Sequence, residues 1–468
     1  MINTPRRHFL RHSAAVTVGF FGLEQYLSAA APTIEPWGPL LKDPHRIADL
    51  PDGFSFRVLS RTGDRMKDGY QVPGQPDGMA AFPAEDGKVV LVRNHEIGHA
   101  YGELGPFKDN SKLPKNFDPS LCYDPGGGEV PPFVGGTSNL VFDPTTGETE
   151  TQFLSLLGTD RNCAGGPTPW GTWITCEEPA DTVSEIGQKH GYCFEVPATT
   201  KTGLTKPVPL KAMGRFRHEA VAVHPDSGTV YLTEDRGDGM IYRFLPNVPG
   251  KLEEGGKLQA LKILDRDSAD TRNWPADEVE FPKRQRFKVE WIDLDEIEAP
   301  LDDLRLRGVE AGAARFSRGE GMWYGSPEQI GDEAIYWCCT DGGKVQQGQI
   351  FRYFPSPLEG QPGEKNQPGE FELFLEPNDT DLLTKGDNIC IAPSGDLIIC
   401  EDAKGINSIR GVTPEGEFYT IASNGMNGSE FCGACFSPDG NWLFVNIQSP
   451  GITLAITGPW RESTNTSA

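Results

Sequence analysis

Histidine is scarce in this chain, with eight residues in 468, and no paired C-x-x-C motifs with zinc-finger spacing are present. A zinc site rich in histidine or cysteine is therefore not expected. The sequence also lacks a G-x-S-x-G nucleophile elbow and a glycine-rich phosphate loop that leads into a helix. Beyond the first thirty or so residues, no apolar run is long enough to span a bilayer, so stable membrane insertion is not expected.

Basic residues are fewer than acidic residues: the chain has 43 Lys and Arg and 67 Asp and Glu, which gives a formal net charge of -24. Such a surface repels a phosphate backbone, which argues against nucleic-acid binding. An excess of acid suits a protein that gathers divalent or trivalent cations. The same charge would also keep an exported protein soluble, so composition alone leaves both interpretations open.

The N-terminus has the pattern of an export signal. Arg6 and Arg7 precede an apolar run that ends near Leu27, and small residues follow at positions 29–31. A positive region, a hydrophobic region and a small-residue cleavage site with twin arginines predict a signal peptide over residues 1–31. We therefore expect export by the twin-arginine (Tat) machinery to the periplasm or beyond. The alternative is an arginine-capped helix.

Glycine and proline are abundant, at 55 and 39 residues, and they separate short apolar runs. Each run ends in a turn, and a second apolar run follows and ends in acids or amides, which is typical of a β-hairpin. The ranges with this pattern are 81–96, 162–178, 224–235, 334–341, 392–402 and 437–448.

About six such units predict an all-β chain folded as a six-bladed β-propeller with loop insertions. The longest insertion covers residues 251–303, which are charged and poor in strand pattern, and residues 107–131 resemble a second loop. No clear linker divides the chain, so residues 32–468 are predicted to form one domain. A β-sandwich is the alternative, but it does not explain why acids recur at the same end of each hairpin.

Acidic residues at those hairpin ends should meet, because equivalent strand ends converge on one mouth of a propeller. The acids that end hairpins are Glu96, Glu178, Asp235, Asp341 and Asp402. Further acids in polar or glycine-flanked loops are Glu219, Glu320, Asp387 and Glu430. Crowded carboxylates raise one another's pKa, and hard cations such as calcium, magnesium or ferric iron relieve this. The simpler interpretation is that the acids cap turns or hold structural calcium only.

The ten cysteines are not spaced as a disulfide scaffold, and most are expected to be small buried hydrophobes. Cys163 is different because of its neighbours. The stretch Asn162 to Thr172 reads NCAGGPTPWGT and, together with Arg217-His218-Glu219 and Arg318-Gly319-Glu320-Gly321, resembles the PhoX alkaline phosphatases. The resemblance spans nearly the whole mature chain.

The resemblance implies a propeller that cleaves phosphate monoesters outside the cytoplasm, with two ferric ions and two or three calcium ions around a bridging oxygen. It implies Cys163, as a thiolate, and Glu219, Glu320, Asp387 and Glu430 as iron ligands. The resemblance implies that calcium would be bound mostly by Glu96, Glu178, Asp235, Asp341 and Asp402. Arg318, Glu320 and Asn94 are the expected catalytic residues, with Arg318 holding the phosphate.

The expected reaction needs no serine or cysteine nucleophile, since a metal-bound oxygen would attack phosphorus in line with the leaving group. The expected partners are small-molecule phosphate esters, and the protein is expected to be a monomer. Two alternatives stay open. One is another metal-dependent propeller hydrolase, such as a phosphodiesterase, phytase or lactonase, and the other is a non-catalytic calcium-binding propeller.

Overall fold

Short strands joined by tight turns make up nearly all the regular structure. The computed structural model describes residues 32–107, 113–115, 117–127, 129–180, 183–184, 186–277 and 280–461. The α-helices of these ranges are α2 (Leu304–Glu310) and α3 (Pro327–Ile330). Among the described residues, no helix is long and apolar enough to cross a membrane. The prediction of an all-β chain is confirmed. The predicted signal peptide, residues 1–31, lies outside the described residues.

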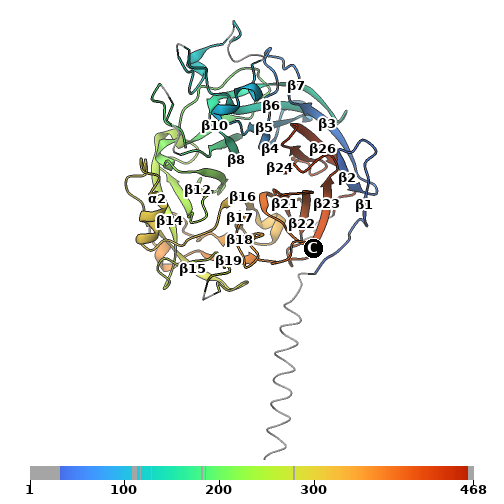
Figure 1. Ribbon diagram of the computed structural model, residues 1–468. Coiled ribbons are helices and arrows are strands. Elements are labelled where there is room, and N and C mark those ends of the chain that lie inside the picture. Colours follow the sequence, from blue (N-terminus) through green and yellow to red (C-terminus); the bar gives the residue numbers. More distant parts are fainter. Residues whose placement is uncertain are drawn as a thin grey trace, which may run out of the picture.

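The strands form antiparallel meanders that follow the chain and are arranged around a common centre (Figure 1). Listed from the centre outward, the first meander is β4 (Pro76–Pro83), β5 (Val89–His95), β6 (Gly135–Asp143) and β7 (Glu148–Thr159). The second is β8 (Asn162–Pro167), β9 (Thr172–Glu177) and β10 (Cys193–Pro197).

The next two meanders are joined into one nine-stranded sheet. One contains β11 (His218–Val223), β12 (Val230–Glu234), β13 (Ile241–Pro246) and β14 (Gly256–Ile263). The other contains β16 (Gly319–Gly325), β17 (Ala334–Cys339), β18 (Gln349–Phe354) and β19 (Glu370–Leu375).

The strand that joins them is β15 (Phe287–Asp293), which pairs with β14 on one side and with β19 on the other. Both β14 and β15 lie within residues 251–303, so the expectation that this insertion is poor in strands was wrong. Val289 and Trp291 of β15 are buried, although charged residues alternate with them and mask the pattern in the sequence.

The N-terminal segment completes the last two sheets. One contains β20 (Gly386–Ile391), β21 (Leu397–Glu401), β22 (Ser408–Val412), β23 (Phe418–Asn424), β2 (Ala48–Pro51) and β1 (Leu40–Leu41). The other contains β24 (Phe431–Phe436), β25 (Leu443–Ile447), β26 (Ile452–Thr457) and β3 (Ser55–Arg61). Since β3 pairs with β26, the first and last parts of the chain meet in one sheet.

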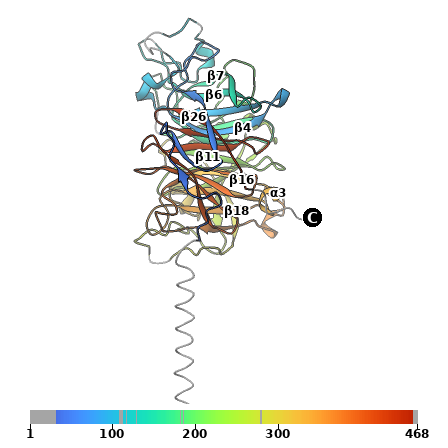
Figure 2. The ribbon, with the colours of Figure 1, turned by 90° about the vertical axis from the view of Figure 1, so that its right-hand side faces the viewer.

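The first strand of each meander faces the centre, and we call β4, β8, β11, β16, β20 and β24 the inner strands. They contact one another in that order, and β24 contacts β4 again, so the ring is closed. Apolar clusters fill the space between neighbouring meanders. Figure 2 shows the same ring from the side. The arrangement is propeller-like.

The centre of the ring is almost filled. A cavity of about 20 Å³ remains there, and small residues such as Gly78, Ala164, Ala220 and Gly321 line it. These positions must be small, because a Cβ on Gly78 would lie 2.6 Å from the Cα of Ala164 on the next inner strand. The bulky Trp323 of β16 packs against several of the apolar clusters. The inner strands are therefore held at fixed, close distances.

Candidate metal and phosphate site

All six inner strands carry the same irregularity near their start. Within this irregular stretch, the inner strand has one residue more than the partner strand, so the pairing register shifts by one, as in a β-bulge. The shifts fall between Pro76 and Met79, Asn162 and Gly165, His218 and Val221, Gly319 and Met322, Gly386 and Ile389, and Cys432 and Cys435. The first residue inside each bulge is, in turn, Asp77, Cys163, Glu219, Glu320, Asp387 and Gly433.

Three of these bulge residues bring carboxylates together. Oxygen atoms of Glu219, Glu320 and Asp387 all lie within 4.8 Å of one another. The same distance holds within a second group, made of Asp387, Asp402 and Glu430. Asp387 belongs to both groups and connects them. The structure therefore brings together five acids whose positions span more than two hundred residues of sequence.

Cys163 lies at the edge of the first group. Its Sγ is 3.4 Å from the carbonyl oxygen of His218 and 3.9 Å from that of Glu219, and its side chain also interacts with the Glu219 carboxyl. Burial, together with the nearby Glu219 charge, raises the pKa of the thiol well above its usual value. A thiolate at this position therefore needs a cation beside it.

A second layer of acids follows the second strand of several meanders. The backbone N–H groups of Glu96, Glu178, Asp235 and Asp402 donate to the carbonyl oxygens of Gln75, Arg161, Arg217 and Lys385, respectively. Each acceptor lies two residues before a bulge residue. Each of these meanders thus supplies one possible ligand from its bulge, which is Cys163 in the β8 meander and an acid in the others, and one acid from the next turn.

Asp341 departs from this arrangement. The equivalent backbone bond in its meander is made by Thr340, whose N–H donates to the carbonyl of Arg318. Asp341 is one residue further along and forms an ion pair with Lys385. The structure therefore places Asp341 at the rim, apart from the two carboxylate groups.

Basic side chains alternate with these acids. Arg318 donates from Nε to Oδ1 of Asp235 at 2.8 Å and from Nη2 to Oε1 of Glu320 at 2.6 Å. Its φ of 48° is unusual for a residue other than glycine and turns the chain into the bulge. The guanidinium is about a third exposed, with 34% of the side-chain surface accessible. It is therefore both fixed by carboxylates and reachable by a ligand.

Asn94 lies next to this site but does not face into it. Its Nδ2 donates to the carbonyl oxygens of Cys163 and Ala164, at 3.1 and 2.7 Å. Its Oδ1 accepts from Nε1 of Trp173 and Oγ1 of Thr175. With its amide used on both sides and no exposed surface, Asn94 fixes the bulge that carries Cys163.

The structure adds Asp77, which the sequence patterns did not predict as a site residue. It is the bulge residue of β4 and is buried, with 5% exposure. Gln448 donates to its Oδ2 at 3.2 Å, whereas its buried Oδ1 has no hydrogen-bond partner. The detectable signal is the Pro76-Asp77-Gly78 triplet, which resembles Gly319-Glu320-Gly321 in having an acid followed by glycine at the start of a strand.

The electrostatics of the cluster are those of crowded, desolvated acids. Burial is the first cause of the raised pKa values of Glu219, Glu320 and Glu430, and neighbouring carboxylates add to it. The pKa of Asp387 rises from 3.8 to about 7, because of burial and of the Asp402 charge. An uncompensated cluster of this kind holds protons at neutral pH, whereas bound cations would allow it to ionise.

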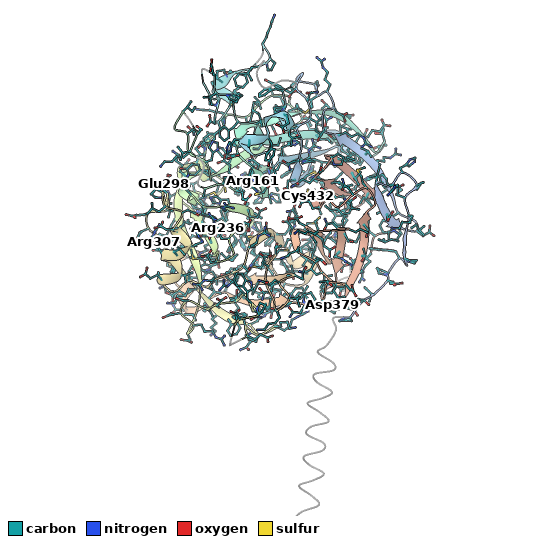
Figure 3. All side chains as sticks on the ribbon, in the orientation of Figure 1. Arg161, Arg236, Glu298, Arg307, Asp379 and Cys432 are labelled. Atoms are coloured by element: carbon teal, nitrogen blue, oxygen red, sulfur yellow. The ribbon has the colours of Figure 1, made fainter. Side chains whose placement is uncertain are left out.

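The donor set fits metal ions. Carboxylates in two connected groups match the preference of hard cations for oxygen ligands, and the thiol of Cys163 adds a ligand suited to a transition metal. The unpartnered Oδ1 of Asp77 is a further buried oxygen at the same mouth. The Sγ of Cys432 is 3.1 Å from the carbonyl oxygen of Pro76, which precedes Asp77. Figure 3 shows Cys432 and Arg161 near the centre of the ring.

The chain is similar to known proteins. The family model described as alkaline phosphatase PhoX matches residues 35–118 and 138–451. A solved structure of Pseudomonas fluorescens PhoX in complex with vanadate, a transition-state analogue, is similar, with a TM-score of 0.62 and 19% identity. That alignment covers 92% of this chain and 98% of the other.

Two further structures are less similar. A gluconolactonase from Xanthomonas campestris has a TM-score of 0.37 at 12% identity, with 91% of this chain and 99% of the other covered. A virginiamycin B lyase from Staphylococcus aureus has a TM-score of 0.37 at 12% identity, with 86% and 99% covered. A comparison with curated protein sequences gave no match. Because the family model covers most of its length, the chain belongs to the alkaline phosphatase PhoX family and is a phosphoric monoester hydrolase.

Proposed function

We propose that this enzyme is a metal-dependent phosphatase that is exported and releases inorganic phosphate from small-molecule phosphate monoesters. The observation that carries the metal part is that Asp387 belongs to two carboxylate groups at once. One shared carboxylate between two groups is the arrangement expected for neighbouring cations. By resemblance to the family, we propose that the site binds two ferric ions and two or three calcium ions.

The residues that would hold the cations are those at the bulges and at the turns behind them. Cys163, Glu219, Glu320, Asp387 and Glu430 would hold iron. Glu96, Glu178, Asp235 and Asp402 would serve calcium, with Asp341 at the rim, and we add Asp77. When bound, the ions would supply Lewis acidity and lower the pKa of a bound water, which provides the nucleophile.

The chain's own contribution is to bind and orient the phosphoryl group. Arg318 presents a planar fork beside Glu320, and a guanidinium suits the non-bridging oxygens of a phosphate. Asp235 and Glu320 fix the direction of the fork, so little ordering remains when the ester binds. Asn94 acts one step further away, by holding the Cys163 bulge in place. The vanadate complex of the Pseudomonas fluorescens enzyme supports a phosphoryl site in this fold.

Three finer features belong to the same proposal. Counting the nine-stranded sheet as two meanders gives six blades, which agrees with the closed ring of six inner strands. We propose that residues 32–468 form this single propeller domain and that it acts as a monomer. The twin-arginine pattern over residues 1–31 supports export by the Tat machinery to the periplasm or beyond.

The proposal is tested by assaying purified protein on p-nitrophenyl phosphate and on bis-p-nitrophenyl phosphate, before and after treatment with a strong chelator. We expect hydrolysis of the monoester well above that of the diester, loss of activity on chelation, and recovery when iron and calcium are returned. Activity that survives complete metal removal would refute the metal part. A preference for the diester would refute the monoesterase assignment.

A further inference from the structure

A groove with a volume of about 460 Å³ opens beside the acidic cluster. Its lining includes His99, Tyr101, Asp160, Arg161, Pro179 and Arg217. The volume lies within the range of about 300–1,000 Å³ that is typical of small-molecule sites. None of these residues is among the proposed metal ligands, so the groove is a separate feature of the same mouth.

Two arginines connect the groove to the cluster. Arg161 and Arg217 each lie two residues before a bulge residue, Cys163 and Glu219, respectively. Both form ion pairs with Glu178, which lies behind them. The groove therefore adjoins the proposed ligands, because its two arginines pair with acids of the cluster.

Carboxylates already contact the hydrogen-bonding edges of both arginines. Arg161 is also 3.1 Å from Glu96, so the two guanidinium groups face two carboxylates. What remains available is the flat face of a guanidinium, which stacks well on aromatic rings.

Tyr101 supplies a second flat surface. It belongs to the short helix η2 (His99–Leu104) and has 56% of its surface exposed. A Cβ built on Gly98 would lie 3.7 Å from Cδ2 of Tyr101 and 3.4 Å from Cγ of Arg161. The tyrosine ring and the arginine stem therefore both lie close to Gly98, and all three residues line the groove.

The wall that carries Tyr101 is well anchored. The backbone N–H of His99 donates to Oδ1 of Asp160 at 3.0 Å, and its ring stacks on Phe133 with centroids 5.4 Å apart. Phe133 stacks in turn on the buried His190, which forms an ion pair with Glu177. An exposed aromatic residue on an anchored wall presents its surface to a ligand at low entropic cost.

We propose that this groove binds the leaving group of the ester and favours a planar aromatic ring, as in aryl phosphates and nucleoside monophosphates. The ring would stack against Tyr101 and the guanidinium of Arg161 while the phosphoryl group lies at the acidic cluster. This inference rests on the proposed phosphatase function and adds a substrate class to it.

The test compares esters with and without a ring. For Tyr101→Ala, we expect the ratio of kcat/KM for phenyl phosphate to that for glycerol phosphate to fall by about fivefold to tenfold, as for a lost aromatic pair. Tyr101→Phe should keep the ratio, because it keeps the ring. Leu301→Ala, which changes a residue that is 82% exposed and outside the groove lining, is the control and should also keep it. Adenosine monophosphate tests whether a nucleobase uses the same surface.

A binding measurement separates this inference from the function on which it rests. Phenylphosphonate and methylphosphonate cannot be hydrolysed as esters, so calorimetry with both probes reports the groove without turnover. We expect wild type to prefer the phenyl compound by about fivefold and Tyr101→Ala to lose the preference. Equal affinities in wild type, an unchanged ratio in Tyr101→Ala, or an equal loss in Tyr101→Phe would overturn the inference. Absence of all ester hydrolysis with a retained phenyl preference would overturn the phosphatase proposal alone.

Discussion

At the scale of single residues, Arg318 is the side chain whose removal should act most directly on catalysis. Arg318→Ala removes a charge-assisted contact to the phosphoryl group, and kcat/KM for an aryl phosphate should fall by about a hundredfold or more, on the order of 3 kcal/mol. Arg307 is a matched control, because its side chain is 33% exposed and lies away from the centre of the ring (Figure 3). Equal rates in wild type and Arg318→Ala would remove Arg318 from the site.

Single residues also show what a sequence reveals about a site. Glu219, Glu320 and Asp387 could be selected because each is an acid beside small or polar residues at the start of a strand. Asp77 has the same local pattern, but the proline before it makes the Pro76-Asp77-Gly78 triplet resemble an ordinary turn. Asn94 was expected in catalysis, but only its four hydrogen bonds show that it supports the β8 bulge.

At the scale of elements, the bulges of the inner strands place the ligands, and small residues make the bulges possible. A Cβ on Gly321 would lie 2.6 Å from the carbonyl oxygen of Asp387 and 2.7 Å from the nitrogen of Ile389, which are backbone atoms that cannot move independently. Gly321→Ala should therefore lower the free energy of unfolding by about 1–3 kcal/mol and reduce metal content as well.

Chemical denaturation and elemental analysis together check this prediction. Gly127→Ala is the control, because its Cβ would meet only Cγ2 of Ile186 at an ordinary 3.6 Å. If Gly321→Ala were as stable as wild type and held the same metal, close spacing of β16 and β20 would not matter for the site.

Hairpins were predictable at this scale because each depends on local signals. In residues 437–443, for example, Ser437 accepts from the N–H of Trp442 and Gly440 has a φ of 74°, which forms the tight turn before the buried β25. The bulges were not predictable, because nearly every residue of the inner strands is buried and the break in alternation that a bulge causes is therefore not visible in the sequence. The pairing of β15 with two different meanders depends on distant strands, so it could not be predicted from the local sequence.

At the scale of the whole molecule, the acidic centre makes folding depend on pH when cations are removed. Asp387 has a pKa of about 7 in the folded protein, against 3.8 as the usual value, so the folded state keeps its proton between these pH values and the unfolded state does not. Stability of the metal-free protein should therefore fall as pH rises from about 4 to 7, by up to about 1.4 kcal/mol per pH unit for each such carboxyl.

Thermal unfolding at pH 5 and pH 8 measures this dependence. Asp387→Asn should lose less stability than wild type between the two values, because the titrating group is gone. Added iron and calcium should restore wild-type stability at pH 8 by binding the ionised carboxylates. An identical pH dependence in wild type and Asp387→Asn would show that the centre does not resist ionisation.

The most direct test of the central claim, that acids from separate meanders share cations at Asp387, is the metal-to-protein ratio of wild type, Asp387→Asn and Asp379→Asn purified side by side. Asp379 is an exposed acid away from the centre of the ring and serves as the matched control (Figure 3). We predict that wild type and Asp379→Asn hold equal amounts of bound metal and that Asp387→Asn, folded but altered at both carboxylate groups, loses most of it. A metal-free wild type, or an Asp387→Asn variant with the full wild-type content, would contradict the account.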